Sequence, residues 1–222
     1  MAWVAGQRGP DRTGDTWCAL LQKWPGVQRI VCDAGTGLAR GVKLLNEARA
    51  AAPLEPGLDP VAPVQVGLDV FHTEREMQRV VSRLWGGAAR RLEEASKADA
   101  QVAQAKQRGI DARTVAGRAR AVWSKAERAF DEAVQAEAAA QRITAALALF
   151  RADGQLNNRV GAQQQITEAL EELRGDAWSK VRRLLNDPRT LNHLDWLHEQ
   201  LAQVVPEPLL REAVAHLALT QH

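Results

Sequence analysis

The hydrophobic pattern of this chain changes at Thr73, and this change constrains the fold more than any other feature of the sequence. Before Thr73, short apolar runs alternate with helical segments and with turns rich in glycine and proline, which is the pattern of an α/β sheet. After Thr73, apolar residues recur at spacings of three and four, which is the pattern of amphipathic helices. The sequence therefore predicts an α/β domain over residues 1–72 and an all-helical region over residues 73–222.

The α/β part is expected to contain three strands and two helices. The strands are predicted at residues 1–6, 27–32 and 64–71, and the helices at about residues 16–24 and 38–52. Because a helix connects the second strand to the third, we expect these two strands to be parallel neighbours in one sheet.

The helical part is expected to begin with a long antiparallel hairpin over residues 73–150. Thr73 and Glu76 have the spacing of a capping box, and the turn is predicted near residues 108–111. Trp123, Phe130 and Val134 are expected on the apolar side of the second helix. Further helices are predicted within residues 155–222, and Asp187 followed by Pro188 is expected to open one of them.

Charge and composition exclude few classes of protein. The formal net charge is only +2, but residues 73–150 carry 14 basic and 10 acidic side chains. This excess is compatible with contacts to nucleic acid, although charge alone favours a solvated helix face. No apolar run approaches the ~18 residues that a bilayer-spanning helix needs. The two cysteines, Cys18 and Cys32, lie among apolar residues and are expected to be free thiols in a reducing compartment.

Asp33 is the first candidate for a chemical role, because it directly follows a predicted strand and precedes a turn with Gly35 and Gly37. Ligands and metals bind at the carboxyl ends of strands in open α/β sheets, and carboxylates there can hold Mg²⁺. The alternative is that Asp33 only caps the following turn or helix. The two glycines do not form a nucleotide-binding motif.

Asp69 and His72 are the second candidate, at the end of the last predicted strand. A histidine beside a carboxylate can bind a metal or exchange protons, but it can equally cap the strand end through hydrogen bonds. A nuclease in which Asp33 and Asp69 share a metal is a further alternative, and it requires both carboxylates within ~4–6 Å of the ion. His193 and His198 are five residues apart, so they are expected to be surface or interhelical residues and not a metal pair.

Several short words of the sequence are similar to one family of proteins. The chain resembles bacterial insertion-sequence transposases of the DD(E) type, which have an RNase H-like catalytic core. The words that carry the resemblance are WVAGQ at residues 3–7, DRTGDTW at 11–17, VCDAGTGL at 31–38, GLDVFH at 67–72, DGQLN at 153–157 and HLDWL at 193–197.

The resemblance implies a fold, an activity and a metal site. In this family two aspartates and a glutamate hold two Mg²⁺ or Mn²⁺ ions, which activate the attacking oxygen and stabilise the leaving oxygen at a DNA phosphate. Asp33 matches the second aspartate, and so would be a catalytic residue and metal ligand. His72 matches the histidine of a C-x-x-H motif of related hAT-type enzymes, which makes Asp69 and His72 possible active-site neighbours. The helical region after Thr73 matches the place where such enzymes insert a helical domain.

The resemblance also implies partners and a location. The partners would be the transposon ends and target DNA, with a homo-oligomer possible, in the cytoplasm and nucleoid of a bacterium and without a membrane. The strand with the first aspartate would precede Met1 and the glutamate would follow His222, so the chain is expected to be an internal fragment that is inactive alone. The alternative is a helical interaction or scaffold protein with a small α/β head. The side chains expected to contact DNA are Arg75, Arg79, Arg83, Arg118, Arg120 and Lys125.

Overall fold

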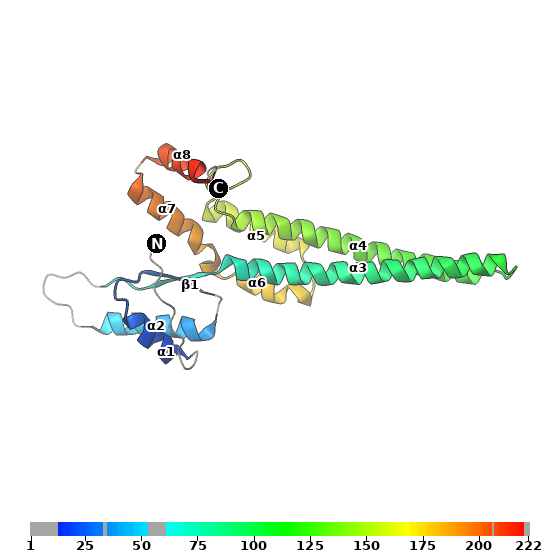
Figure 1. Ribbon diagram of the computed structural model, residues 1–222, viewed down its shortest axis with the longest axis horizontal. Coiled ribbons are helices and arrows are strands. Elements are labelled where there is room, and N and C mark those ends of the chain that lie inside the picture. The colour runs from blue at the N-terminus through cyan, green and yellow to red at the C-terminus, as the bar shows by residue number, and fades with distance from the viewer. Residues whose placement is uncertain (1–12, 33–34, 53–60, 206, 220–222) are drawn as a thin grey trace.

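The structure of the chain is a computed structural model that describes residues 13–32, 35–52, 61–205 and 207–219. It is mainly helical, with one small sheet (Figure 1). The elements are α1 (Gly14–Gln22), β1 (Arg29–Cys32), α2 (Thr36–Ala51), β2 (Gln65–Leu68), α3 (Val70–Gln107), α4 (Arg113–Leu147), α5 (Arg159–Glu172), η1 (Asp176–Trp178), α6 (Ser179–Leu185), η2 (Pro188–Leu191), α7 (Asn192–Val204) and α8 (Pro208–Leu219).

The head of the molecule contains the two described strands, which are parallel neighbours as the sequence predicts. Arg29 pairs with Gln65 at one end of the ladder and Cys32 pairs with Leu68 at the other. Helix α2 connects them, and Leu21 of α1 packs with Val42 and Leu45 of α2 in the core of the head. A mainly helical protein with a small α/β head is therefore confirmed. The strand predicted at residues 1–6 lies outside the described residues.

Helix α3 begins earlier than the sequence analysis expected, and this corrects the end of the predicted strand 64–71. Strand β2 ends at Leu68, and Asp69 is the N-cap of α3, because its carboxylate accepts a hydrogen bond of 3.0 Å from the Phe71 backbone N–H. An aspartate satisfies the free N–H groups of the first turn as well as a threonine does. The predicted capping box at Thr73 is therefore wrong, and Thr73 is instead a buried residue inside α3.

Helices α3 and α4 form the predicted hairpin, whose outer half projects beyond α5 and α6 (Figure 1). The turn lies at residues 108–112, where Gly109 has a φ of +68°. Only glycine adopts this left-handed conformation without a steric cost. The turn near residues 108–111 is thus confirmed.

The seam of the hairpin, where α3 and α4 pack against each other, consists on the α4 side largely of alanine. Larger apolar residues were instead expected from the sequence on this side of α4. Phe130 and Val134, which were expected on the apolar side of this helix, are 41% and 43% exposed and therefore lie outside the buried seam. Small side chains allow two helices to pack closely, so the larger apolar residues lie beside the seam. The buried seam residues of α4 recur every seven positions at Ala119, Ala126, Ala133, Ala140 and Leu147.

The base of the hairpin is covered by α5 and α6, and here the main hydrophobic core lies. Its fully buried members come from six elements, α3, α4, α5, α6, η2 and α7. Burial of such side chains is the main stabilising contribution to a domain of this size. The large buried side chains are Met77, Ile143, Ile166, Val181, Leu185, Leu191 and Leu194.

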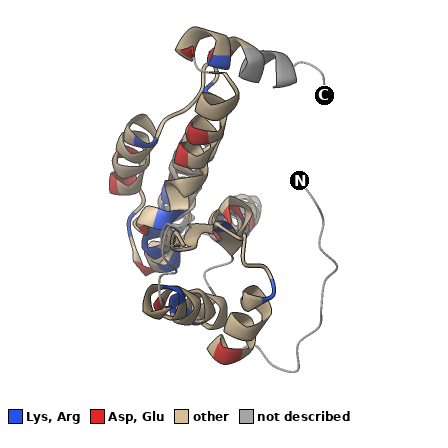
Figure 2. Ribbon diagram, turned by 90° about the vertical axis from the view of Figure 1, so that its left-hand side faces the viewer, with Lys and Arg blue, Asp and Glu red and all other residues tan. Residues whose placement is uncertain are grey.

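Helix α7 joins the helical part to the head. The Trp196 ring lies over Gly67, where an added Cβ would come within 2.8 Å of the ring, and its Nε1 donates to Gln65 Oε1 at 2.7 Å. Asn192 Nδ2 donates to the Val66 carbonyl at 2.7 Å. Helices α1 and α2 lie on one side of this junction and α7 and α8 on the other, in two perpendicular views (Figures 1 and 2).

We expect the double substitution Gly86→Ala, Gly87→Ala to raise the free energy of unfolding by about 1–2 kcal/mol, because glycine inside a helix costs roughly 0.5–1 kcal/mol relative to alanine. Both glycines lie within α3, and an added Cβ would meet no atom within 4 Å at either position. Urea unfolding followed by circular dichroism measures the change. Gly41→Ala is the control that should destabilise, since its Cβ would lie 2.4 Å from the Trp17 Cβ. A loss of stability in the double variant would contradict an uninterrupted α3.

Candidate functional site at the carboxyl end of the sheet

The carboxyl ends of β1 and β2 meet at one edge of the sheet. The Asp69 backbone N–H donates to the Cys32 carbonyl at 2.8 Å, so the chain leaves both strands at neighbouring points. Asp33 follows Cys32 in the sequence but lies outside the described residues, so its predicted catalytic and metal-binding role stays a prediction. The same holds for a metal shared by Asp33 and Asp69.

A cavity of about 170 Å³ opens at this edge. Its apolar wall consists of Cys32, Leu68 and Leu184, which pack together. Its polar wall comes from the start of α3 and from α6, two elements that are more than a hundred residues apart in sequence. The polar residues are Asp69, His72, Thr73, Glu76, Lys180 and Arg183.

The predicted pair Asp69 and His72 does lie at this cavity. One carboxylate oxygen of Asp69 accepts the Phe71 N–H, and the other lies 3.5 Å from His72 Nδ1. Asp69 is therefore the N-cap of helix α3, and it does not cap the end of strand β2. Within the described part of the chain, no three His, Cys, Asp or Glu residues are grouped so that they could hold a metal ion.

Glu76 fastens α6 to α3 beside the cavity. Its carboxylate accepts hydrogen bonds from Lys180 Nζ at 2.9 Å and from Arg79 Nη1 at 2.5 Å. The hydrogen bond from Lys180 is the main cause that holds the pKa of Glu76 below its ordinary value, and Arg79 acts in the same direction. Glu76 is thus a carboxylate whose charge is already balanced.

Among the described residues, two polar atoms at the cavity, Thr73 Oγ1 and His72 Nδ1, are buried and have no hydrogen-bond partner. Thr73 is only 1% exposed. An unsatisfied buried polar group costs roughly 1–3 kcal/mol, so such atoms call for an explanation. A ligand or an ordered water molecule in this cavity could supply the missing hydrogen-bond partner for these two atoms.

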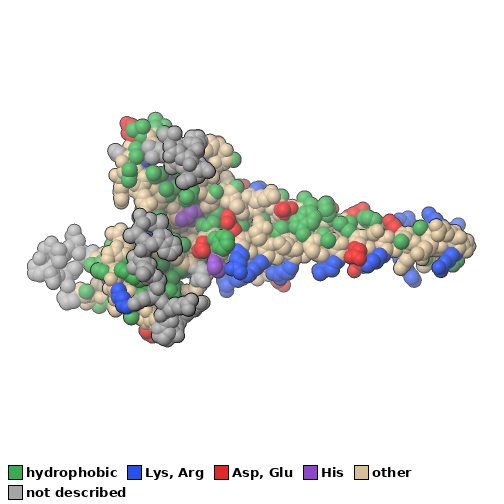
Figure 3. Space-filling model, in the orientation of Figure 1, with side chains coloured by type: hydrophobic (Ala, Val, Ile, Leu, Met, Phe, Trp, Pro, Cys, Tyr) green, Lys and Arg blue, Asp and Glu red, His purple; other side chains and the backbone are tan. Residues whose placement is uncertain are grey.

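A second candidate surface lies along α3. Arg75, Arg79 and Arg83 are exposed and four residues apart, and Arg90 and Lys97 continue the row at spacings of seven. At 100° per residue all five fall within about 80° of one helix face, opposite the seam with α4. We call these five residues the α3 basic stripe. A row of basic side chains is visible along the lower edge of the hairpin (Figure 3).

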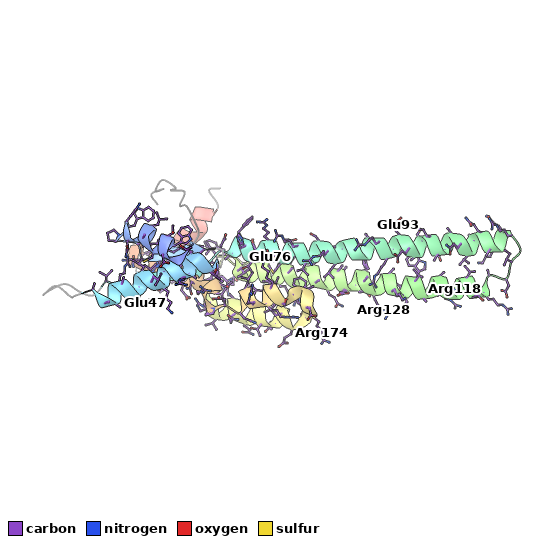
Figure 4. All side chains as sticks on the ribbon, turned by 90° about the horizontal axis from the view of Figure 1, so that it is seen from below. Glu47, Glu76, Glu93, Arg118, Arg128 and Arg174 are labelled. Atoms are coloured by element: carbon purple, nitrogen blue, oxygen red, sulfur yellow. The ribbon has the colours of Figure 1, made fainter. Side chains whose placement is uncertain are left out.

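The remaining predicted DNA contacts do not extend this surface. Arg118 and Arg120 are both exposed on α4. Because they are two residues apart, they are separated by about 200° around the helix axis, so they point to different sides of the helix. Lys125 lies on the flank of α4 near Arg128, in a groove that also contains Glu94 and Glu132. Glu93 on α3 and Arg128 on α4 are labelled on opposite edges of the hairpin (Figure 4).

The two helical histidines lie between helices. His193 Nδ1 and Nε2 contact the Thr190 and Leu147 carbonyls at 3.0 and 2.8 Å, and His198 Nε2 contacts the Asn157 carbonyl at 2.7 Å. His193 thus ties α7 to the end of α4, and His198 ties α7 to the segment between α4 and α5, as expected of residues that lie between helices.

Comparisons with protein-family models, with curated proteins and with solved structures found no match for the chain.

None of the helices in the described part of the chain is both long and apolar enough to cross a bilayer.

Proposed function

We propose that the chain is part of a DNA transposase of the DD(E) type, and that its described residues contribute DNA binding. One observation carries the proposal. β1 and β2 are adjacent and parallel, and a long helical region follows β2 directly, which is the order of elements that the resemblance implies. Asp33 would then be one carboxylate ligand of Mg²⁺ or Mn²⁺ at the carboxyl end of β1, with Asp69 and His72 as its neighbours.

The described residues do not by themselves fit a two-metal site. Asp69 is used as a helix cap, Glu76 is paired with Lys180 and Arg79, and no group of three metal-ligating side chains is present among the residues that the structure describes. We therefore assign no step of strand cleavage or transfer to them. Their proposed contribution is to hold the DNA backbone.

The α3 basic stripe is the surface best suited to that contribution. Arg75 and Lys97 are 22 residues apart, which corresponds to about 33 Å along the helix axis and thus to about one turn of duplex DNA. Arginines four residues apart are separated by about 6 Å along the axis. Lysine and arginine contacts to phosphates position a protein on DNA without selecting its sequence.

Duplex binding by the chain is expected to depend steeply on salt. If four or five phosphates are neutralised, the slope of log K against log salt concentration is about −4, and affinity falls more than about a hundredfold between roughly 50 and 200 mM salt. Fluorescence anisotropy with labelled duplexes of about 20 base pairs and unrelated sequences measures the slope. Similar affinity for all duplexes is the expected result. The absence of binding at the lowest salt concentration, or a slope near zero, would reject the proposal.

A helical interaction protein with a small α/β head is the second candidate. Apolar side chains on one flank of the hairpin favour it, because Phe130 and Val134 are partly exposed and Phe130 stacks edge-on against Trp85 with ring centroids 5.4 Å apart. Exposed aromatic residues are enriched at protein interfaces. Failure of duplex binding, together with self-association that Phe130→Ser abolishes, would favour this candidate over the first.

A further inference from the structure

The cavity at the carboxyl end of the sheet has hydrogen-bond donors that none of the described residues uses. Thr73 Oγ1 is buried and has no hydrogen-bond partner within the described part of the chain. Lys180 uses its ammonium group on Glu76 alone, so it has further N–H groups to donate. Arg183, an exposed residue that lines the cavity, has no hydrogen bond or ion pair with any residue that the structure describes. A guanidinium has five N–H donors in a planar arrangement that matches the oxygens of a phosphate.

The two carboxylates that the structure describes at the cavity, Asp69 and Glu76, do not oppose an anion as strongly as their number suggests. Asp69 accepts a backbone N–H at the start of α3 and lies 3.5 Å from His72 Nδ1. Glu76 accepts hydrogen bonds from Lys180 and Arg79. One oxygen of each carboxylate already accepts hydrogen bonds, which offsets part of its charge, and the donors of Thr73, Lys180 and Arg183 remain for an anion.

The position and size of the cavity agree with this charge pattern. Thr73 is the fourth residue of α3, so the cavity lies against the first turn of a helix of 38 residues, where free N–H groups and the helix dipole favour negative charge. A cavity of about 170 Å³, with room for roughly five water molecules, is large enough to hold a phosphate group.

We propose that this cavity receives one phosphate group of a DNA strand, bound by Thr73, Lys180 and Arg183. The inference rests on the proposed DNA-binding function and adds to it a specific position for one phosphate beside the predicted position of Asp33. The α3 basic stripe would hold the duplex by charge alone, whereas the cavity would fix where the strand enters the edge of the sheet.

The test uses two ligands that are too small to span the α3 basic stripe, a thymidine dinucleotide with one internal phosphodiester and inorganic phosphate. Isothermal titration calorimetry measures their binding to the full chain. Arg183→Gln should weaken dinucleotide binding about tenfold or more, as the loss of a charge-assisted contact does, and Thr73→Val should weaken it roughly fivefold. Thr73→Val keeps the shape of the side chain and removes only an unpaired hydroxyl, so the fold should be retained. Lys180 is left unchanged because it also anchors Glu76.

Arg174→Gln is the matched control, because it removes the same charge from an exposed arginine that lines a different groove. It should leave dinucleotide binding unchanged. Binding of neither ligand, or an equal loss in Arg174→Gln and Arg183→Gln, overturns the phosphate site. Binding of inorganic phosphate without the dinucleotide overturns a DNA strand as its source.

The proposed function and the phosphate site can fail separately. Duplex binding that is lost with the stripe arginines but unaffected by Thr73→Val and Arg183→Gln would support the proposed function and overturn the phosphate site. Dinucleotide binding that needs Thr73 and Arg183, in a chain that does not bind duplex DNA, would support the phosphate site and reject the proposed function.

Discussion

Replacement of Arg75, Arg79 and Arg83 by glutamine is expected to weaken duplex binding about a hundredfold or more at about 100 mM salt, and to reduce the salt slope by about 2.7. Each phosphate contact contributes about 0.9 to this slope through the release of counterions, so three contacts account for the change. The three side chains are exposed on one face of α3. Among their contacts in the structure, Arg79 pairs with Glu76, which keeps Lys180 as a partner in the variant, so we expect the fold to be retained.

The control for this experiment is a second triple variant in which Arg118, Arg120 and Lys125 are replaced by glutamine. It changes the net charge by the same amount, so any difference between the two variants reports the arrangement of the charges. Because Arg118 and Arg120 point to different sides of α4, no one duplex can contact all three residues, and we expect a loss of less than about tenfold. Equal losses in both variants would show that binding follows net charge and that the α3 basic stripe is not the binding surface.

The α/β head was predictable because its signals are local. A run of apolar residues followed by Asp33 and a turn predicts the end of a strand, and one helix between two strands implies a parallel pair. The prediction failed where two local signals competed. Thr73 and Glu76 have capping-box spacing, but Asp69 caps the helix four residues before Thr73, and β2 is shorter than its apolar run for that reason.

The seam of the hairpin was not predictable by the same reasoning. The helical periodicity was assigned from the large apolar side chains, so Phe130 and Val134 were predicted to lie on the apolar side of the helix. The repeat that is buried consists of alanines such as Ala126 and Ala133, which are abundant in this chain and are good helix formers wherever they occur. Only the packing of α3 against α4 distinguishes the alanines in the seam from those in solvent.

The candidate site was half visible in the sequence. Asp69 and His72 follow a strand and could be proposed from that position alone. Lys180 and Arg183 come from α6, and no local pattern connects them with residues at the start of α3. Their place at the cavity follows from tertiary packing, in which Leu184 contacts Cys32 and Leu68.

The end of α4 depends on a buried side chain, Asn157, which the sequence shows only as the last residue of the word DGQLN, with no local sign of this role. Asn157 is 2% exposed, and its Nδ2 donates to the Ala146 and Ala148 carbonyls at 2.8 and 3.1 Å. Its Oδ1 accepts the Asn158 backbone N–H at 2.9 Å. The last carbonyls of a helix have no partner within the helix, so this amide supplies one at a place that water does not reach easily.

Asn157→Ala should lower the free energy of unfolding by about 2–4 kcal/mol, because it removes the amide and leaves the two carbonyls that it bonded without this donor, next to the main core. Asn158→Ala is the matched control on the adjacent residue. Asn158 is exposed and caps α5 by accepting the Gly161 N–H at 2.9 Å, so its loss should cost only about 1 kcal/mol. Urea unfolding of the two variants, followed by circular dichroism, measures the difference. Equal destabilisation would mean that Asn157 contributes no more than an ordinary helix cap. The contact of His193 with the Leu147 carbonyl would then be enough to hold α7 against the end of α4.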